Sequence, residues 1–139
     1  MPRDRFGPRR RRFGDFGERV AASHLEQKGY NILERNWSAP VGEIDLIVSR
    51  GDELVFVEVR SRQGRKMGTP EESITGRKAE HVRAAAAAYV QQHPEAPVNQ
   101  RIDAVVIELD AKGRVMRVEQ IENAIEDEDE SAGDDSLAT

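Results

Sequence analysis

The sequence predicts an α/β fold, in which a mixed β-sheet is flanked by helices in the order helix, three strands, helix, two strands. Residues 15–29 and 77–92 carry apolar side chains at the spacing of one helix face. Between and after them lie short runs rich in Val, Ile, Leu and Phe, which are typical of strands. A chain of 139 residues is long enough for one such domain.

Each predicted helix has recognisable ends. In the first, Asp15 is the expected N-cap, Glu18 is its capping-box partner and Gly29 is the expected stop. The second ends before the His93-Pro94 pair, because a proline disfavours helical backbone in the residue before it. Its predicted buried stripe consists of Val82, Ala85, Ala86, Tyr89 and Val90.

Five segments are predicted to be strands. The first covers residues 30–37, and a hairpin follows between Gly42 and Arg62. Gly51-Asp52 suits the two-residue turn of this hairpin, with glycine in the first central position. Residues 101–109 are apolar on both faces, as in a central strand, and residues 114–118 form the last strand.

The hairpin register predicts a pair of facing carboxylates. Val48 is predicted to face Val55, Leu46 to face Val57 and Ile44 to face Val59, so that the aliphatic residues share one buried face. On the other face Glu43 then lies opposite Arg60 and Asp45 opposite Glu58, and directly opposed like charges destabilise a sheet. A cation, a shared proton or a neighbouring base (Arg60, Arg62 or Lys78) could offset this cost.

A metal ion is the functional interpretation of this pair. Two carboxylates and a backbone carbonyl make a typical incomplete site for Mg²⁺ or Mn²⁺. Glu18 borders the apolar face of the first helix and is predicted to point toward the sheet, where it could be a third ligand. As a capping residue, Glu18 also has a purely structural explanation.

Charge is distributed unevenly along the chain. Residues 1–13 are predicted to be a flexible basic arm, and residues 14–125 form the domain. Residues 126–139 are predicted to be a disordered acidic tail. The arm includes Arg9, Arg10, Arg11 and Arg12, which are candidates for phosphate contacts. This pattern is compatible with nucleic-acid binding; alternatively, both ends are merely solvated, or the tail mimics nucleic acid.

Composition excludes several other classes of protein. The chain has no cysteine, so it has neither disulfides nor thiolate metal sites. Its three histidines have no spacing typical of zinc sites. No apolar run approaches the roughly 18 residues of a membrane span, so we expect a cytoplasmic protein without a membrane partner.

Motifs spread over residues 14–125 resemble a known family. They are GE at 17–18, GYNIL at 29–33, NW at 36–37, GEIDLI at 42–47, FVEVRSR at 56–62, Gly68, Pro70, Lys78, RID at 101–103 and IENA at 121–124. The chain resembles the (D/E)xK nuclease superfamily and, more narrowly, the YraN-type family. That family is described as endonuclease-like and as related in fold to Holliday-junction resolvases.

The resemblance implies a restriction-endonuclease-like core with Glu18, Asp45 and Glu58 at the metal-binding positions. Arg60 stands where the family pattern usually has a catalytic lysine. Arginine stays protonated, so it can hold a phosphate but cannot act as a general base. Lys78 is the better candidate for the missing amine, with Lys66 as the second choice.

Two functions therefore remain open at the level of sequence. The first is a metal-dependent nuclease that acts on branched or flapped DNA, in which Asp45, Glu58, Arg60 and Lys78 form the catalytic site and Arg62 contacts nucleic acid. The second is a nucleic-acid-binding module that has lost or attenuated cleavage. A homodimer is possible in either case, because related resolvases are symmetric dimers.

Overall fold

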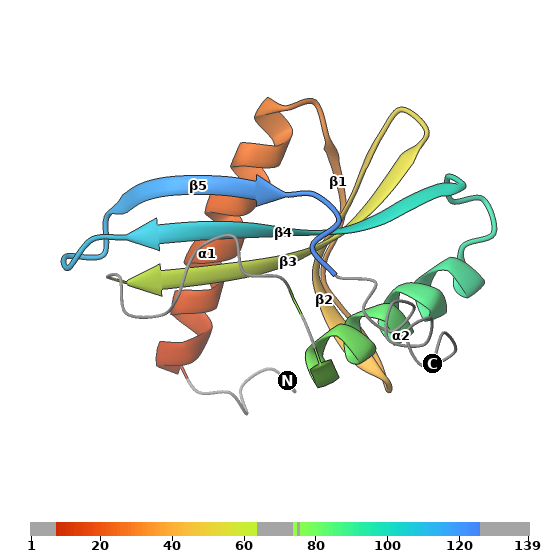
Figure 1. Ribbon diagram of the computed structural model, residues 1–139, viewed down its shortest axis with the longest axis horizontal. Coiled ribbons are helices and arrows are strands. Elements are labelled where there is room, and N and C mark those ends of the chain that lie inside the picture. Colours follow the sequence, from red (N-terminus) through yellow and green to blue (C-terminus); the bar gives the residue numbers. More distant parts are fainter. Residues whose placement is uncertain (1–7, 64–73, 75, 126–139) are drawn as a thin grey trace, which may run out of the picture.

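The computed structural model describes residues 8–63, 74 and 76–125 (Figure 1). Its elements are α1 (Pro8–Gln27), β1 (Asn31–Ala39), β2 (Gly42–Arg50), β3 (Glu53–Gln63), α2 (Gly76–Gln92), β4 (Asn99–Leu109) and β5 (Val115–Ile121). This order confirms the predicted sequence of helix, three strands, helix and two strands. Neither described helix is long and apolar enough to cross a membrane.

The five strands form one mixed sheet in the order β1-β2-β3-β4-β5. Neighbouring strands are antiparallel except β3 and β4, which are parallel and connected through α2. A parallel pair needs such a crossover connection, since a tight turn cannot join strands that run the same way. The mixed sheet confirms the predicted α/β class and is the arrangement that the nuclease resemblance implies.

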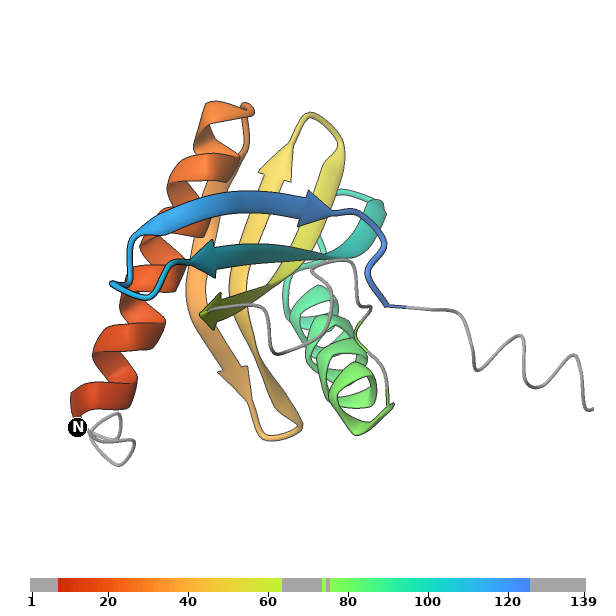
Figure 2. The same cartoon turned by 60° about the vertical axis from the view of Figure 1, so that its left-hand side comes forward.

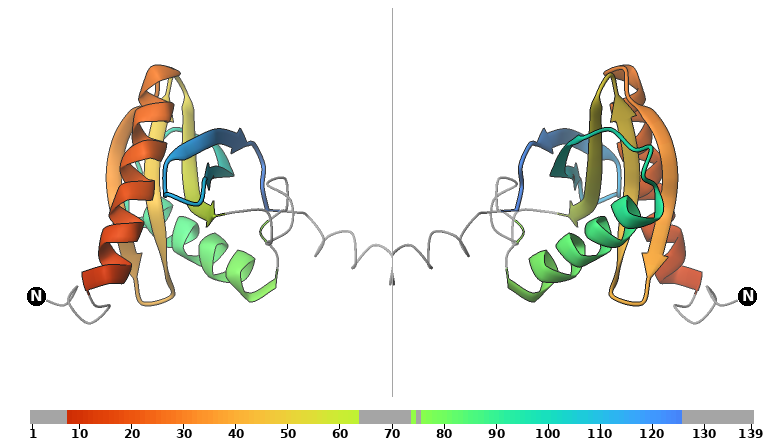
Figure 3. Two further views of the ribbon diagram at one scale, coloured as in Figure 1. Left: turned by 90° about the vertical axis from the view of Figure 1, so that its left-hand side faces the viewer. Right: turned by 90° about the vertical axis from the view of Figure 1, so that its right-hand side faces the viewer.

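The two helices cover opposite faces of the sheet (Figures 2 and 3). On the α1 face the buried core consists of Ala21, Ala22, Leu25, Tyr30, Leu46, Val48, Val55, Val57, Val105, Ile107 and Leu109. On the α2 face one buried cluster consists of Ile44, Ile47, Leu54, Phe56, Ala85, Ala86 and Tyr89, and a second of Ile74, Ala79, Val82, Ala104, Ala124 and Ile125. The predicted α2 stripe is confirmed, with Val90 partly buried at its edge.

Helix α1 begins earlier than predicted. It starts at Pro8 rather than at Asp15, so Asp15 does not cap it and Glu18 is not a capping-box residue. Proline is well tolerated in the first turn of a helix, and the four arginines that follow are good helix formers. Positions 8–13, predicted to belong to the flexible arm, are therefore helical. Residues 1–7 and 126–139 lie outside the described residues.

The hairpin register is confirmed near its turn and wrong beyond it. Arg50 pairs with Glu53, Val48 with Val55 and Leu46 with Val57, and Gly51 has the positive φ of 60° that the turn requires. In the described hairpin the β2–β3 pairing ends there, so the predicted pairs Asp45–Glu58, Ile44–Val59 and Glu43–Arg60 do not form. Ile44 also packs on the α2 face, whereas Leu46 packs on the α1 face. The alternation of faces along β2 is therefore broken at Asp45.

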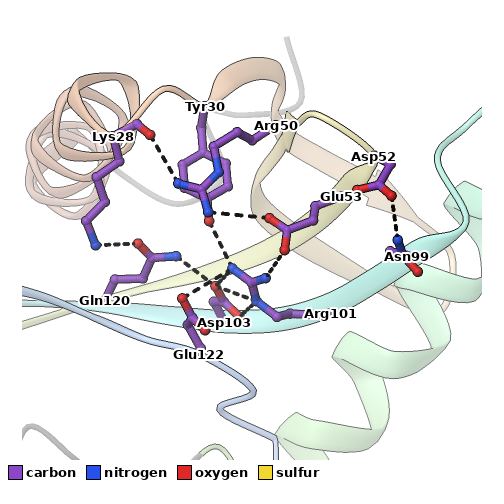
Figure 4. Close-up of polar contacts among 10 residues, drawn as sticks. All are labelled: Lys28, Tyr30, Arg50, Asp52, Glu53, Asn99, Arg101, Asp103, Gln120 and Glu122. Atoms are coloured by element: carbon purple, nitrogen blue, oxygen red, sulfur yellow. Dashed lines mark hydrogen bonds and ion pairs between the residues drawn. The ribbon is translucent and has the colours of Figure 1, made fainter.

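A polar cluster around Arg101 and Asp103 of β4 links this strand to neighbouring segments of the fold (Figure 4). Asp103 is fully buried, yet its carboxylate accepts hydrogen bonds from Arg101 Nε at 2.9 Å, Gln120 Nε2 at 2.8 Å and the Asn123 backbone N–H at 3.0 Å. A buried carboxylate is tolerated in a fold when it is paired and hydrogen-bonded in this way.

Arg101 extends the cluster to two further segments. It donates to Glu53 Oε2 at 2.9 Å, at the start of β3, and to the Tyr30 hydroxyl at 2.9 Å, just before β1. The Arg50 guanidinium lies 4.2 Å from the centre of the Tyr30 ring, where a cation–π contact is favourable (Figure 4). Together, Arg101 and Asp103 thus connect β3, β4, β5 and the segment just before β1.

We expect Asp103→Ala to lower the free energy of unfolding by about 3–5 kcal/mol, because it leaves the Arg101 charge without its buried partner. Urea unfolding measures this change. Glu122→Gln is the control: its carboxylate is 3.7 Å from Arg101 but its side chain is 60% exposed, so the expected loss is below about 1 kcal/mol. Equal losses of unfolding free energy in the two variants would contradict a stabilising role for the buried Arg101–Asp103 pair.

Candidate functional site

Asp45 lies at the point where β2 and β3 part. Its Oδ2 accepts a hydrogen bond of 2.8 Å from the backbone N–H of Val59, two residues beyond the last β2–β3 pair. The side chain therefore replaces the strand-to-strand hydrogen bond that the separated backbone of β2 can no longer make. The predicted face-to-face pair gives way to an acid that bridges two diverging strands.

Glu58 is the buried acid next to this gap. Its side chain is almost fully enclosed, and the residue is 3% exposed. Oε1 lies 3.2 Å from Lys78 Nζ, whereas Oε2 has no hydrogen-bond partner among the described residues. Buried carboxylate oxygens are seldom left unpaired, because removing them from water is unfavourable. The free oxygen marks a position where a ligand or cation would be stabilised.

Lys78 approaches Glu58 from the first turns of α2. Its own side chain is 65% exposed, so the ammonium group reaches the buried acid from the solvent side. Gly42 allows this approach: a Cβ at this position would lie 2.7 Å from the backbone oxygen of His81, one helical turn after Lys78. Only a residue without a side chain lets β2 and α2 pack this closely.

Glu18 comes from the other helix. Its Oε1 accepts a hydrogen bond of 2.9 Å from Asn36 Nδ2 on β1. The preceding Gly17 is buried, and a Cβ there would lie 2.8 Å from Ser61 Oγ on β3. Because α1 can approach the sheet at this glycine, Glu18 is held against the strands and not in open solvent.

The arrangement was partly foreseen from the sequence. Asp45, Glu58 and Lys78 come together, and Glu18 is close enough to Asp45 for the two charges to interact. In residues 8–63, 74 and 76–125, however, no three Asp, Glu or His side chains converge closely enough to hold a metal ion together. A three-carboxylate centre is thus not preformed, and metal binding stays a prediction.

The other predicted site residues lie around this centre or outside the described part of the chain. Arg60 and Arg62 follow Glu58 along β3 and are half-buried. Arg9 to Arg12 occupy the first turns of α1, and Lys66 lies outside the described residues. The sequence did not predict the hydrogen bond from Asn36 to Glu18; its signals were an asparagine inside a predicted strand, where this residue is rare, and the NW motif at 36–37.

Comparison with known proteins places the chain in a family. The model of "Uncharacterised protein family UPF0102" matches residues 17–107. The chain belongs to uncharacterised protein family UPF0102. This confirms the resemblance to the YraN family.

Individual relatives match over most of their length. A UPF0102 protein of Moorella thermoacetica is 46% identical over 115 residues, which cover 83% of this chain and 96% of the relative. A UPF0102 protein of Frankia alni is 43% identical over 111 residues, covering 80% and 92% of the two chains. Among solved structures, SfsA of Pyrococcus furiosus in complex with Ca²⁺ is 15% identical with a TM-score of 0.36. This match covers 83% of this chain and 64% of SfsA.

The acids of this UPF0102 chain hold protons unusually well. Burial raises the pKa of Glu58 to about 7, with a further contribution from Asp45, although Lys78 opposes the change. Burial likewise raises the pKa of Glu18 to about 7, against the hydrogen bond from Asn36. Burial raises the pKa of Asp45 as well, while the Val59 amide counteracts it. Near neutral pH the site therefore carries either protons or unfavourable negative charge, which a cation would relieve.

The raised pKa values of these acids predict that the stability of the fold depends on pH. The pKa of Glu58 rises from 4.5 to about 7 on folding, so between these values the folded state binds more protons than the unfolded state. The stabilising contribution is complete below the lower value and is lost as pH rises through about 7. We expect Glu58→Gln to remove at most about 3 kcal/mol of this pH dependence.

Urea unfolding of both proteins from about pH 5 to about pH 8 measures the difference. Comparison with the variant matters because His24, whose pKa is lowered by burial, contributes a slope of the opposite sign that is common to both proteins. Parallel stability curves for wild type and Glu58→Gln would contradict the raised pKa.

Proposed function

We propose that this UPF0102 chain is a metal-dependent nuclease that acts on DNA, with Mg²⁺ or Mn²⁺ held chiefly by Asp45 and Glu58. One observation carries the proposal: the half-buried Asp45 and the buried Glu58, which has an unpartnered oxygen, meet beside Lys78 where two strands separate. A site with perturbed acids and a specific basic neighbour is a candidate for catalysis.

The residues fit a hard divalent cation. Mg²⁺ prefers oxygen ligands and is commonly bound by only one or two carboxylates, with waters and substrate phosphate completing its shell. Asp45 and Glu58 supply that number without a preformed three-acid centre. Glu18, whose charge already acts on Asp45, is the third proposed ligand. When bound, such a cation would polarise the scissile phosphate and make a bound water more acidic.

The remaining residues take roles set by their chemistry. Lys78, 3.2 Å from Glu58, would orient the attacking water or stabilise charge on the phosphate. Arg60 and Arg62 on β3 would hold phosphates, and Arg9 to Arg12 at the start of α1 would add contacts that are independent of sequence. The resemblance to resolvases supports branched or flapped DNA as the substrate class.

A second candidate function is a nucleic-acid-binding module without cleavage. Arg60 occupies the position of the usual catalytic lysine and cannot act as a base. The described residues contain no preformed three-ligand centre, which also favours this alternative. The two candidates differ in one measurable property, because only the nuclease needs the metal.

We expect wild-type protein to bind Mn²⁺ in calorimetry at about pH 8, where the carboxyl groups with raised pKa values have lost their protons. The double variant Asp45→Asn/Glu58→Gln should lose this binding while remaining folded, since the neutral side chains remove an unfavourable charge. The control Asp52→Asn/Glu122→Gln changes two exposed acids elsewhere and should bind Mn²⁺ normally.

The same proteins should then be tested on flap and four-way-junction DNA. Cleavage by wild type and control, and none by the site variant, is the expected result. DNA binding without any Mn²⁺ binding in the wild type would reject the nuclease and favour the non-catalytic module.

A substitution of Lys78 should distinguish DNA cleavage from Mn²⁺ binding. Because its ammonium group contacts Glu58 but is not a metal ligand, Lys78→Met should reduce the cleavage rate by about 10²–10⁴-fold, the range of acid–base contributions, with Mn²⁺ affinity retained. Lys112→Met, in the β4–β5 turn, is the matched control. Equal cleavage rates in the two variants, measured in single-turnover assays, would remove Lys78 from the mechanism.

A further inference from the structure

We propose that Asn36 is a positioning residue that holds the Glu18 carboxylate beside Asp45, so that both can face one cation. This inference rests on the proposed function, in which Glu18 is a metal ligand. Asn36 touches no reacting group itself and acts through Glu18.

The backbone of Asn36 is the first sign of a special role. Its φ is +52°, and only one other non-glycine residue in the described chain, Asn123, has a positive φ. A left-handed conformation is unfavourable for L-residues, although asparagine tolerates it better than most. Such an outlier inside a strand persists only when its surroundings hold it, and outliers of this kind gather at functional sites.

The side chain of Asn36 provides the contact. Its Nδ2 donates to Glu18 Oε1 at 2.9 Å in a half-buried position, and so joins β1 to α1. A hydrogen bond to a carboxylate is stronger than one between neutral groups and restricts its orientation. The donor is an uncharged amide, so Glu18 gains a partner without losing its negative charge. A lysine or arginine here would instead compete with a bound cation.

The position of Asn36 also connects it with Asp45. The β1–β2 pairs Arg35–Leu46 and Trp37–Ile44 flank it, so Asn36 lies opposite Asp45 across the two strands. This is the same place where the alternation of faces in β2 is broken. One residue is therefore hydrogen-bonded to Glu18 and adjacent to Asp45, which come from different elements of the fold.

Asn36→Gly tests the role of the side chain. Glycine adopts positive φ readily, so the variant removes the amide while keeping the backbone. Asn123→Gly makes the same chemical change at the other described asparagine with a left-handed backbone, and there the hydrogen bond to Asp103 is donated by the backbone N–H, which glycine keeps. Loss of a ligand-orienting group typically weakens metal binding by about 10–100-fold, which is the expected change in Mn²⁺ Kd for Asn36→Gly alone.

Two further measurements identify the path of the effect. In a Glu18→Ala background, Asn36→Gly should cause no additional loss of Mn²⁺ affinity, because the residue acts through Glu18. NMR relaxation of the metal-free protein should show a more mobile Glu18 side chain in Asn36→Gly and an unchanged one in Asn123→Gly. A residue that merely stabilised the strand would alter the melting temperature but produce neither result.

The outcomes separate this inference from the proposed function. If wild type binds Mn²⁺ and Asn36→Gly binds it equally well, the inference is overturned and the nuclease proposal stands. If wild type binds no Mn²⁺, the proposed function fails, and Glu18 mobility alone decides: unchanged mobility overturns the positioning role, and increased mobility upholds it. Additive losses in the Glu18→Ala background would also overturn it.

Discussion

The hydrogen bond from the Val59 amide to the Asp45 carboxylate is the interaction on which the candidate site depends. Backbone N–H groups inside a protein must be paired, and within a sheet the neighbouring strand normally provides the partner. Here a side chain provides it, at 2.8 Å, so β2 and β3 can separate without leaving Val59 unsatisfied. The separation makes room for Glu58 and for the approach of Lys78.

The two faces of the β3–β4 pair carry differently paired charges. On the α1 face, Arg101 and Asp103 lie beside Val55 and Val57 of β3 and form hydrogen bonds to several segments, which satisfy the buried Asp103 carboxylate. Glu58 follows Val57 by one residue and contacts Lys78 of α2, yet one of its carboxylate oxygens has no partner among the described residues. A fully paired acid and a partly paired acid therefore lie at neighbouring positions of the sheet, and a glycine at each helix contact lets α1 and α2 approach it closely.

The sequence predicted what local signals determine. The order of elements, the buried stripe of α2 and the hairpin register next to Gly51-Asp52 all follow from periodicity and turn chemistry. The predicted start of α1 was wrong: Asp15 is a favourable N-cap residue, but the helix extends back to Pro8. The predicted pairing of Asp45 with Glu58 was wrong. Directly opposed carboxylates destabilise a pair of strands, and β2 and β3 separate before these two residues would face each other. Nothing local marked Asn36 as the partner of Glu18, since that contact depends on how α1 crosses the sheet.

The partners of the acids differ in a way that matters for cation binding. Glu58 is paired with an ammonium group on a largely exposed side chain, which can move away without disturbing the core. Glu18 is paired with a neutral amide, which keeps its orientation but leaves its charge uncompensated. Burial then raises the pKa of both acids to about 7, so near neutral pH each group exchanges between its protonated and its ionised form. Cation binding and proton release would therefore be one coupled event, and the stability that the buried acids cost the metal-free fold near neutral pH would return when the cation binds.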